Sequence, residues 1–164
     1  MAENYQTTRL TLQQLTLEDD AFIFELVNTS GWLTFIGDRN VLSVKDAGSY
    51  IQRIRSNPQI NYWVVRTKNT LIPIGVVTFI KRDYLKHYDI GFAFLPQYGG
   101  QGFAFEAAEV VLKYVLSTGK HHCILATTLI ENASSIKLLG QLGFTFEKTI
   151  KNEDKQLSLY SFTK

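Results

Sequence analysis

The spacing of apolar and polar residues along the chain predicts a definite series of strands and helices. Residues 8–12 alternate between polar and apolar positions, which is typical of a half-buried strand. Thr16, followed three residues later by Asp19, marks a helix start, because such a pair satisfies free N–H groups of the first turn. Ser43 and Asp46 repeat this signal. Two helices are therefore expected after the first strand.

Strands make up most of the remaining chain, with two further helices between them. The predicted strands are 60–67, 71–80, 87–95, 123–129, 144–151 and 156–163, and the predicted helices are 103–117 and 133–142. The resulting order, β-α-α-β-β-β-α-β-α-β-β, is that of an α+β fold. One β-loop-α-β unit within it is expected to be parallel and right-handed.

Composition narrows the class of protein. The 164 residues are 45% hydrophobic, which is enough for one compact core, so we expect a single domain over residues 1–164. The net charge of +2 implies no broad attraction to nucleic acid or to a membrane surface, and neither partner is expected. The first residues lack the pattern of a signal peptide, and no apolar run is long enough to span a bilayer. With Cys123 as the lone cysteine, these features predict a cytoplasmic protein.

A glycine-rich turn before the predicted helix 103–117 is the strongest local signal of a ligand site. Backbone N–H groups and the positive end of a helix dipole bind anions at such a turn. A phosphate-binding P-loop is excluded because Gly102 is followed by Phe103-Ala104 rather than by Lys and Ser or Thr. A dinucleotide fingerprint is excluded because Phe105 stands where close helix packing needs glycine or alanine. A tight turn without a ligand is the alternative.

Four short motifs place this turn in a wider pattern. They are the loop Gln97-x-x-Gly100-x-Gly102-x-Ala104, the preceding Asp89-Ile90-Gly91-Phe92, the later Glu131-Asn132-Ala133-Ser134-Ser135 with Leu142-Gly143-Phe144, and an upstream segment with Phe35-Ile36-Gly37-Asp38-Arg39 and Tyr50-Ile51. Together they resemble the GNAT family of N-acetyltransferases, in the form that acetylates ribosomal proteins (the Rim type). The resemblance covers nearly the whole chain. It implies a central mixed, mostly antiparallel sheet of about seven strands flanked by about four helices.

The resemblance also implies acetyl-CoA as cosubstrate, with its pyrophosphate on the backbone N–H groups from Tyr98 to Ala104. Because two strands splay apart in this family, the pantetheine arm is expected to pair with backbone near Phe94 and Leu95, and an N–H near Leu95 to serve the oxyanion. Asn132 is expected on the opposite wall, a place compatible with its alternative role as a helix cap. The full set of expected cofactor-binding residues is Phe94, Leu95, Gln97, Tyr98, Gly99, Gly100, Gln101, Gly102, Phe103, Ala104, Asn132 and Ser135.

Two residues are candidates for the proton transfers that acetylation of an amine requires. Asp89 falls where some family members keep a catalytic glutamate, and it is expected to accept the ammonium proton through water; alternatively, it is a strand-start residue bonded to a turn. Ser135 matches the acid proposed for the Rim type; alternatively, it is a first-turn serine bonded to backbone. The tyrosine acid of many relatives is excluded because Leu139 occupies its position.

The acceptor is expected to be a primary amine, on a small molecule or at a protein N-terminus. The resemblance places Trp32 and Phe35 beside the acceptor, although both also suit the core. No metal is expected, because the adjacent His121-His122-Cys123 point to alternating sides of an extended chain. We predict a monomeric or homodimeric enzyme that works by direct attack in a ternary complex. The alternative is a non-catalytic acyl-CoA-binding or regulatory module.

Overall fold

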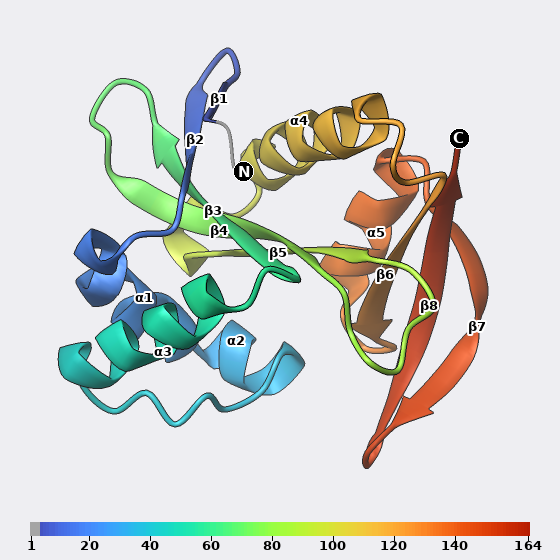
Figure 1. The fold of residues 1–164 in the computed structure, drawn as a ribbon, viewed down its shortest axis with the longest axis horizontal. Helices are drawn as coiled ribbons and strands as arrows, with labels where there is room; N and C mark the ends of the chain where they lie inside the picture. The colour runs from blue at the N-terminus through green and yellow to red at the C-terminus, as the bar shows by residue number, and fades with distance from the viewer. Residues whose placement is uncertain (1–3) are drawn as a thin grey trace.

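One twisted sheet runs through the protein, whose computed structural model describes residues 4–164 (Figure 1). Its strands are β1 (Tyr5–Gln6), β2 (Leu10–Gln14), β3 (Ile60–Thr67), β4 (Pro73–Ile80), β5 (Asp89–Phe94), β6 (Cys123–Leu129), β7 (Thr145–Asn152) and β8 (Lys155–Thr163). They lie in the order β1-β2-β3-β4-β5-β6-β8-β7. All neighbours are antiparallel except β5 and β6, which are parallel and joined through a helix. The predicted α+β fold with a mixed, mostly antiparallel sheet is confirmed.

The sheet has eight strands where the sequence predicted about seven. The additional strand is β1, which pairs Tyr5 with Leu12 and Gln6 with Thr11. Two residues are too few to show an alternating pattern, so no strand was predicted there. The first predicted strand, 8–12, is β2 and lies slightly later in the chain.

The α-helices number five rather than about four: α1 (Asp20–Val27), α2 (Ser30–Phe35), α3 (Val44–Ser56), α4 (Phe103–Ser117) and α5 (Ala133–Gln141). Short 3₁₀ turns, η1 (Leu17–Asp19) and η2 (Pro96–Tyr98), precede α1 and the glycine loop. The unpredicted helix is α2, which is capped by the Thr29 hydroxyl accepting the Trp32 N–H at 3.3 Å. Trp32 and Phe35 therefore lie on a helix and not in a loop. No helix within residues 4–164 has both the length and the apolar composition needed to cross a membrane.

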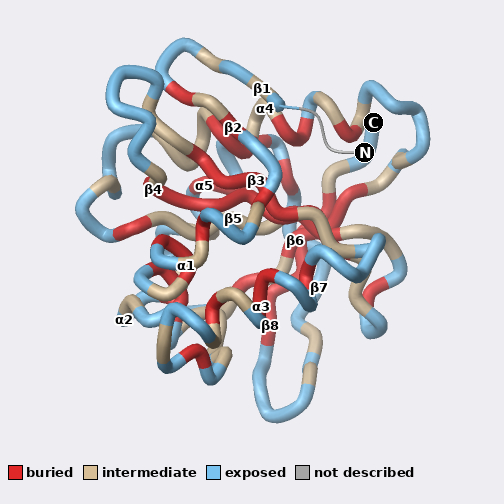
Figure 2. The backbone as a smooth tube through the Cα atoms, turned by 60° about the vertical axis from the view of Figure 1, so that its left-hand side comes forward, coloured by how far each residue is buried: buried red, intermediate tan, exposed pale blue. Residues whose placement is uncertain are grey.

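Helices cover both faces of the sheet, so the central strands are buried on both sides (Figure 2). Helices α1 and α3 pack on one face, where β3 contributes Tyr62 and Val64. Helices α4 and α5 pack on the other face, where β3 contributes Trp63 and Val65. Because successive residues of a strand point to opposite faces, one strand supplies two separate cores. Strand β7 forms the far edge of the sheet and is largely exposed.

Candidate active site

The parallel strands β5 and β6 separate immediately after they meet, which opens the middle of the sheet. They share one bridge, between Asp89 and Leu125, where the Leu125 N–H donates to the Tyr88 carbonyl at 2.9 Å. Beyond Asp89 the two strands make no further pairs. The splayed strands implied by the resemblance are therefore present, and the edge of β5 that faces β6 is left without a neighbouring strand.

The backbone groups exposed along this gap differ in part from those expected. The Leu95 N–H donates to the Ile74 carbonyl of β4 at 2.9 Å, so it is not available to a substrate oxyanion. Pairing alternates along an antiparallel strand, so the N–H and C=O groups of Phe92 and Phe94 point away from β4 and into the gap. The donor expected near Leu95 must therefore be sought at Phe94.

The glycine loop places free backbone N–H groups at the start of α4. The N–H groups of Tyr98 and Gly99 are used within the turn, donating to the Leu95 and Pro96 carbonyls at 3.0 and 3.1 Å. No carbonyl or side chain within residues 4–164 accepts the N–H groups of residues 100–105, which include all four that a helix leaves free at its start. The anion cradle predicted from Tyr98 to Ala104 thus begins later, at Gly100.

Two glycines give this loop its shape. Gly100 and Gly102 adopt φ values of +71° and +81°, in the left-handed region that favours glycine. A Cβ built on Gly100 would have no atom within 4 Å, so the space beside its backbone is open. Gly102 is the N-cap of α4 and offers no side-chain oxygen to the first turn. A negatively charged group can therefore approach the backbone directly.

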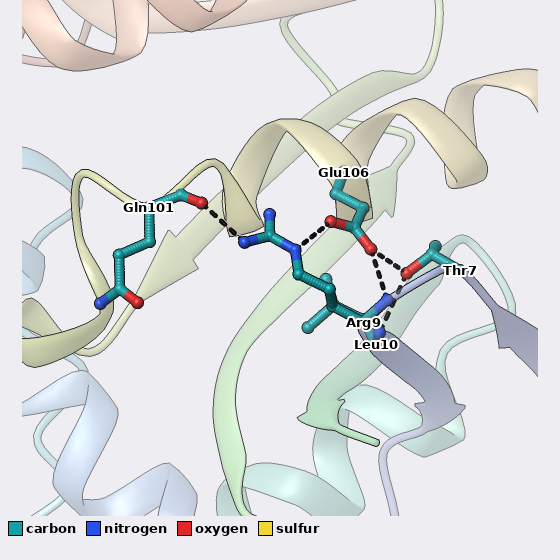
Figure 3. Close-up of polar contacts among 5 residues, drawn as sticks. All are labelled: Thr7, Arg9, Leu10, Gln101 and Glu106. Carbon is teal, nitrogen blue, oxygen red and sulfur yellow. Dashed lines mark hydrogen bonds and ion pairs between the residues drawn. The ribbon is translucent and has the colours of Figure 1, made fainter. Parts of the chain in front are cut away.

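Arg9, which directly precedes β2, connects the glycine loop to helix α4 (Figure 3). Its Nε donates to the Glu106 carboxylate at 2.8 Å, and its Nη1 donates to the Gln101 carbonyl at 3.0 Å. Its guanidinium also lies 4.3 Å from the centre of the Phe103 ring. Burial acts to raise the pKa of Glu106, but the hydrogen bonds from the Thr7 hydroxyl and from Arg9 outweigh it, and the pKa is lowered. The ion pair with Arg9 also neutralises Glu106, which is the acidic residue in the first turn of α4.

The helix α5 presents two candidate residues on the other side of the gap. The Asn132 Oδ1 accepts the Ser135 N–H at 3.3 Å, so Asn132 caps α5 as its alternative role predicted. Both residues also line the cleft described below. The Ser135 hydroxyl makes no hydrogen bond to any residue within 4–164, in contrast to the bonded first-turn serine that the sequence left open. Leu139, which occupies the position of the tyrosine acid in many relatives, is buried in the core.

Asp89 lies at the fork between β5 and β6 and is only 3% exposed. Its Oδ2 accepts a hydrogen bond from the Arg82 Nε at 2.9 Å, while its Oδ1 is buried without a partner among the described residues. Burial raises the pKa of the Asp89 carboxyl, and Arg82 opposes this rise. Asp89 therefore begins β5 and is bonded to the connection between β4 and β5, as its alternative role predicted, although the sequence did not identify Arg82 as the partner.

An aromatic wall from α2, α3 and β3 faces this fork. The hydroxyl groups of Tyr50 and Tyr62 are 3.1 Å apart. Burial raises the pKa of Tyr62, and the Tyr50 hydroxyl raises it further, so the Tyr62 hydroxyl remains protonated. Trp32 is buried and its indole N–H has no partner among residues 4–164, while Phe35 is partly exposed.

One cleft of about 1530 Å³ joins these parts. That volume exceeds the roughly 300–1,000 Å³ of a typical single-ligand pocket, so it has room for two substrates. Most predicted residues line it: Asp89, Phe94, Tyr98, Gly99, Gly100, Gly102, Phe103, Ala104, Asn132, Ser135, Trp32 and Phe35. Leu95, Gln97 and Gln101 do not, since Leu95 points into the core and the two glutamine side chains lie outside the cleft. Within residues 4–164, no group of three or more His, Cys, Asp or Glu side chains is placed to hold a metal ion.

Comparison with known proteins decides the family. Residues 9–145 match the family model described as the acetyltransferase (GNAT) domain. The chain belongs to the GNAT acetyltransferase family. The uncharacterized N-acetyltransferase YnaD of Bacillus subtilis is 27% identical over 146 residues, which are 88% of this chain and 84% of that protein. The sequence-based prediction of a GNAT N-acetyltransferase is confirmed.

Solved structures similar to this GNAT protein show the same fold. RimL, a ribosomal L7/L12 alpha-N-protein acetyltransferase in complex with coenzyme A, gives a TM-score of 0.84 at 16% identity, with 98% of each chain covered. A spermidine N-acetyltransferase, a SpeG chimera from Vibrio cholerae, gives a TM-score of 0.78 at 20% identity, covering 95% of this chain and 96% of that one. At these identities the likeness establishes the fold alone.

Several residues of this GNAT site were missed from the sequence. Arg82 was missed because it meets Asp89 only through the chain reversal between β4 and β5. Arg9 was missed because its partner Glu106 lies 97 residues away. The Tyr50 and Tyr62 hydroxyl pair joins a helix to a strand. Tyr50 stands in the upstream motif, but nothing in the sequence paired it with Tyr62, and Arg9 and Arg82 belong to none of the quoted motifs.

Proposed function

We propose that this GNAT protein transfers the acetyl group of acetyl-CoA directly to a primary amine within a ternary complex. The observation that carries the proposal is the gap between β5 and β6, with a free strand edge at Phe92 and Phe94, directly beside the unpaired N–H groups of residues 100–105. A strand edge can pair with the amides of an extended arm, and N–H groups at a helix start can hold a pyrophosphate. The two features are adjacent in one cleft.

Each step of the reaction has a candidate residue. Acetyl-CoA would supply the acetyl group as an activated thioester. The Phe94 N–H stabilises the negative charge that develops on the carbonyl oxygen, because it faces the gap without a protein partner. The unbonded Ser135 hydroxyl protonates the departing thiolate. Asp89 accepts the proton of the ammonium group through water, using the oxygen that Arg82 does not bind.

The acceptor is a primary amine, on a small molecule or at a protein N-terminus. RimL is named for acetylating the N-terminus of a ribosomal protein, and SpeG for acetylating spermidine, so the fold accommodates both kinds of acceptor. The same proposal assigns the protein to the cytoplasm, as a monomer or homodimer. A second candidate function, a non-catalytic acyl-CoA-binding module, is favoured by one observation: the ion pair with Arg82 holds the Asp89 carboxylate as a structural partner would.

Thiol release from acetyl-CoA over a panel of primary amines tests the proposal, with mass spectrometry of the products. The panel contains amino acids, polyamines and short peptides with free N-termini. We expect amine-dependent release and a product heavier by one acetyl group, and neither with Gly100→Asp protein. Acetyl-CoA binding without release above the buffer rate for every amine would instead establish the binding module.

A further inference from the structure

Two cations from opposite walls of the cleft converge on one point. Arg39 lies in the segment between α2 and α3, and Lys155 begins β8. The Arg39 Nη1 and the Lys155 Nζ each lie 3.4 Å from the position that a Cβ on Gly37 would take. The Lys155 Nζ also donates to the Ile36 carbonyl at 3.4 Å, which ties the β7–β8 hairpin to this segment. Two like charges are thus held close together against the backbone of Gly37.

No carboxylate within residues 4–164 forms an ion pair with Arg39 or Lys155. Every ion pair within residues 4–164 lies elsewhere, and none includes Arg39, Lys155 or the nearby Arg53. The Arg39 guanidinium lies 5.9 Å from the centre of the Trp32 ring, and the Arg53 guanidinium lies 5.9 Å from that of Tyr50. Aromatic faces hold such groups in place without neutralising them. Two arginines and a lysine therefore face the cleft with their charges unpaired.

The acidic residues that line the cleft form no ion pair with this cluster within residues 4–164. Asp89 is bound by Arg82, and the Asp38 Oδ1 accepts the Asn40 N–H at 2.8 Å within its own turn. Glu153 lies on the exposed turn between β7 and β8, where its charge acts on Tyr84. Like charges held close together repel, and an anion between them removes that repulsion and gains charge-assisted hydrogen bonds.

We propose that the amine acceptor of this protein also carries a carboxylate, and that Arg39 and Lys155 bind that carboxylate in the space beside Gly37. This inference rests on the proposed acetyl transfer and names its substrate class. Arg39 also acts electrostatically on the Tyr62 hydroxyl, so the cation pair adjoins the aromatic wall that faces Asp89. An acceptor whose amine lies near Asp89 then has its carboxylate at the cations. A polyamine lacks this group and brings a further positive charge instead.

Two matched pairs of acceptors test this substrate class. The first pair is 4-aminobutanoate and 4-aminobutanamide, and the second is the C-terminally amidated dipeptides alanyl-aspartate and alanyl-asparagine. We expect kcat/KM of the wild type to be about 10-fold higher for the charged member of at least one pair, since hydrogen bonds to charged groups contribute on that order. A preference within the first pair identifies a small amino acid, and one within the second identifies an acidic peptide.

Variants that remove one positive charge test whether Arg39 and Lys155 cause the preference for the charged acceptor. Arg39→Gln and Lys155→Gln should each abolish most of the preference, because they slow the charged acceptor more than the neutral one. Arg55→Gln on α3 and Lys151→Gln on β7 are the matched controls, because both residues are exposed and lie outside the cleft. These controls should keep the wild-type preference.

The outcomes separate this inference from the acetyl transfer on which it rests. Equal rates for both members of both pairs, or equal losses for both members in Arg39→Gln, would overturn the carboxylate site while acetyl transfer stands. If no amine is acetylated, the proposed function fails, and calorimetric titration of CoA-saturated protein with 4-aminobutanoate and with the aspartyl dipeptide decides the site. Binding that Arg39→Gln weakens about 10-fold supports it, and the absence of binding for both ligands overturns it.

Discussion

At the scale of single residues, Ser135 is the simplest part of the proposed chemistry to test, because its hydroxyl has no other bond to lose. Ser135→Ala should lower kcat by about 10²-fold, the lower end for general acid catalysis, since a CoA thiolate leaves readily. The KM for acetyl-CoA should change little, because proton donation matters chiefly in the transition state. Steady-state kinetics on the best acceptor measure both. Ser134→Ala, one position earlier on the same helix, is the control, and a full kcat in Ser135→Ala would exclude the serine as acid.

The proposed role of Asp89 as a base predicts how kcat/KM depends on pH. Burial raises the pKa of its carboxyl, so the base is lost as pH falls through that raised value, and wild-type kcat/KM should fall with it. Asp89→Asn should remove this step, be slower near neutral pH and approach the wild type near pH 10, where a lysine-like amine loses its own proton (pKa about 10.4). The pH profile of kcat/KM checks this, with the exposed Asp83→Asn as control. A wild-type profile in Asp89→Asn, together with a lower melting temperature, would leave Asp89 a purely structural partner of Arg82.

The site residues that the sequence predicted are those whose role follows from nearby residues. The glycines of the loop, and Asn132 as the cap of α5, are specified within a few positions of the chain. Long-range partners are different in kind. Arg9 meets Glu106 across 97 residues, and Lys155 meets the Ile36 carbonyl across 119 residues. Such pairs are fixed by the sheet order, which no local pattern encodes.

At the scale of elements, the glycine loop at the start of α4 gives the sharpest charge test. Gly100→Asp and Gly100→Asn place side chains of equal size on the same left-handed backbone, and both residue types tolerate that region better than most. Only aspartate adds negative charge where the pyrophosphate would lie. Gly100→Asp should bind acetyl-CoA at least about 10-fold more weakly than Gly100→Asn by calorimetry, with a smaller gap at high salt. Equal affinities in two folded variants would reject the loop assignment.

Elements with strong local signals were predicted well, and short ones were not. Thr16, Ser43 and Asn132 each begin a helical segment, as their types and spacing predicted. Helix α2 was missed because its six residues are too few to form an apolar stripe at helical spacing. Tertiary packing stabilises helix α2 instead, since Trp32 is buried in the core shared by α1 and α3. The position of Trp32 and Phe35 in the aromatic wall could therefore not be predicted, because it is set by helix α2.

At the scale of the whole molecule, the sheet itself creates the binding cleft. Strands β3 and β4 are covered on both faces and hold the core, while β5 and β6 diverge between two sets of helices (Figure 1). In the proposed function, the cosubstrate side takes its groups from β5, α4 and α5, and the acceptor side takes its groups from α2, α3 and the β7–β8 hairpin, all of which line the cleft. Binding acetyl-CoA should therefore stabilise the folded protein as a whole, because the ligand joins elements from both halves of the sheet.

This coupling predicts a ligand-specific rise in melting temperature. At 100 times its Kd, a ligand adds about 2.7 kcal/mol to the free energy of unfolding by mass action. For a domain of this size each kcal/mol raises Tm by about 2–4 °C, so acetyl-CoA should raise it by about 5–10 °C. NADH should raise it little, because Phe105 stands where a dinucleotide-binding helix needs glycine or alanine. Thermal denaturation with each ligand measures both shifts, and Gly100→Asp should lose the acetyl-CoA shift that Gly100→Asn retains. Equal shifts with NADH and acetyl-CoA would restore the dinucleotide interpretation of the loop.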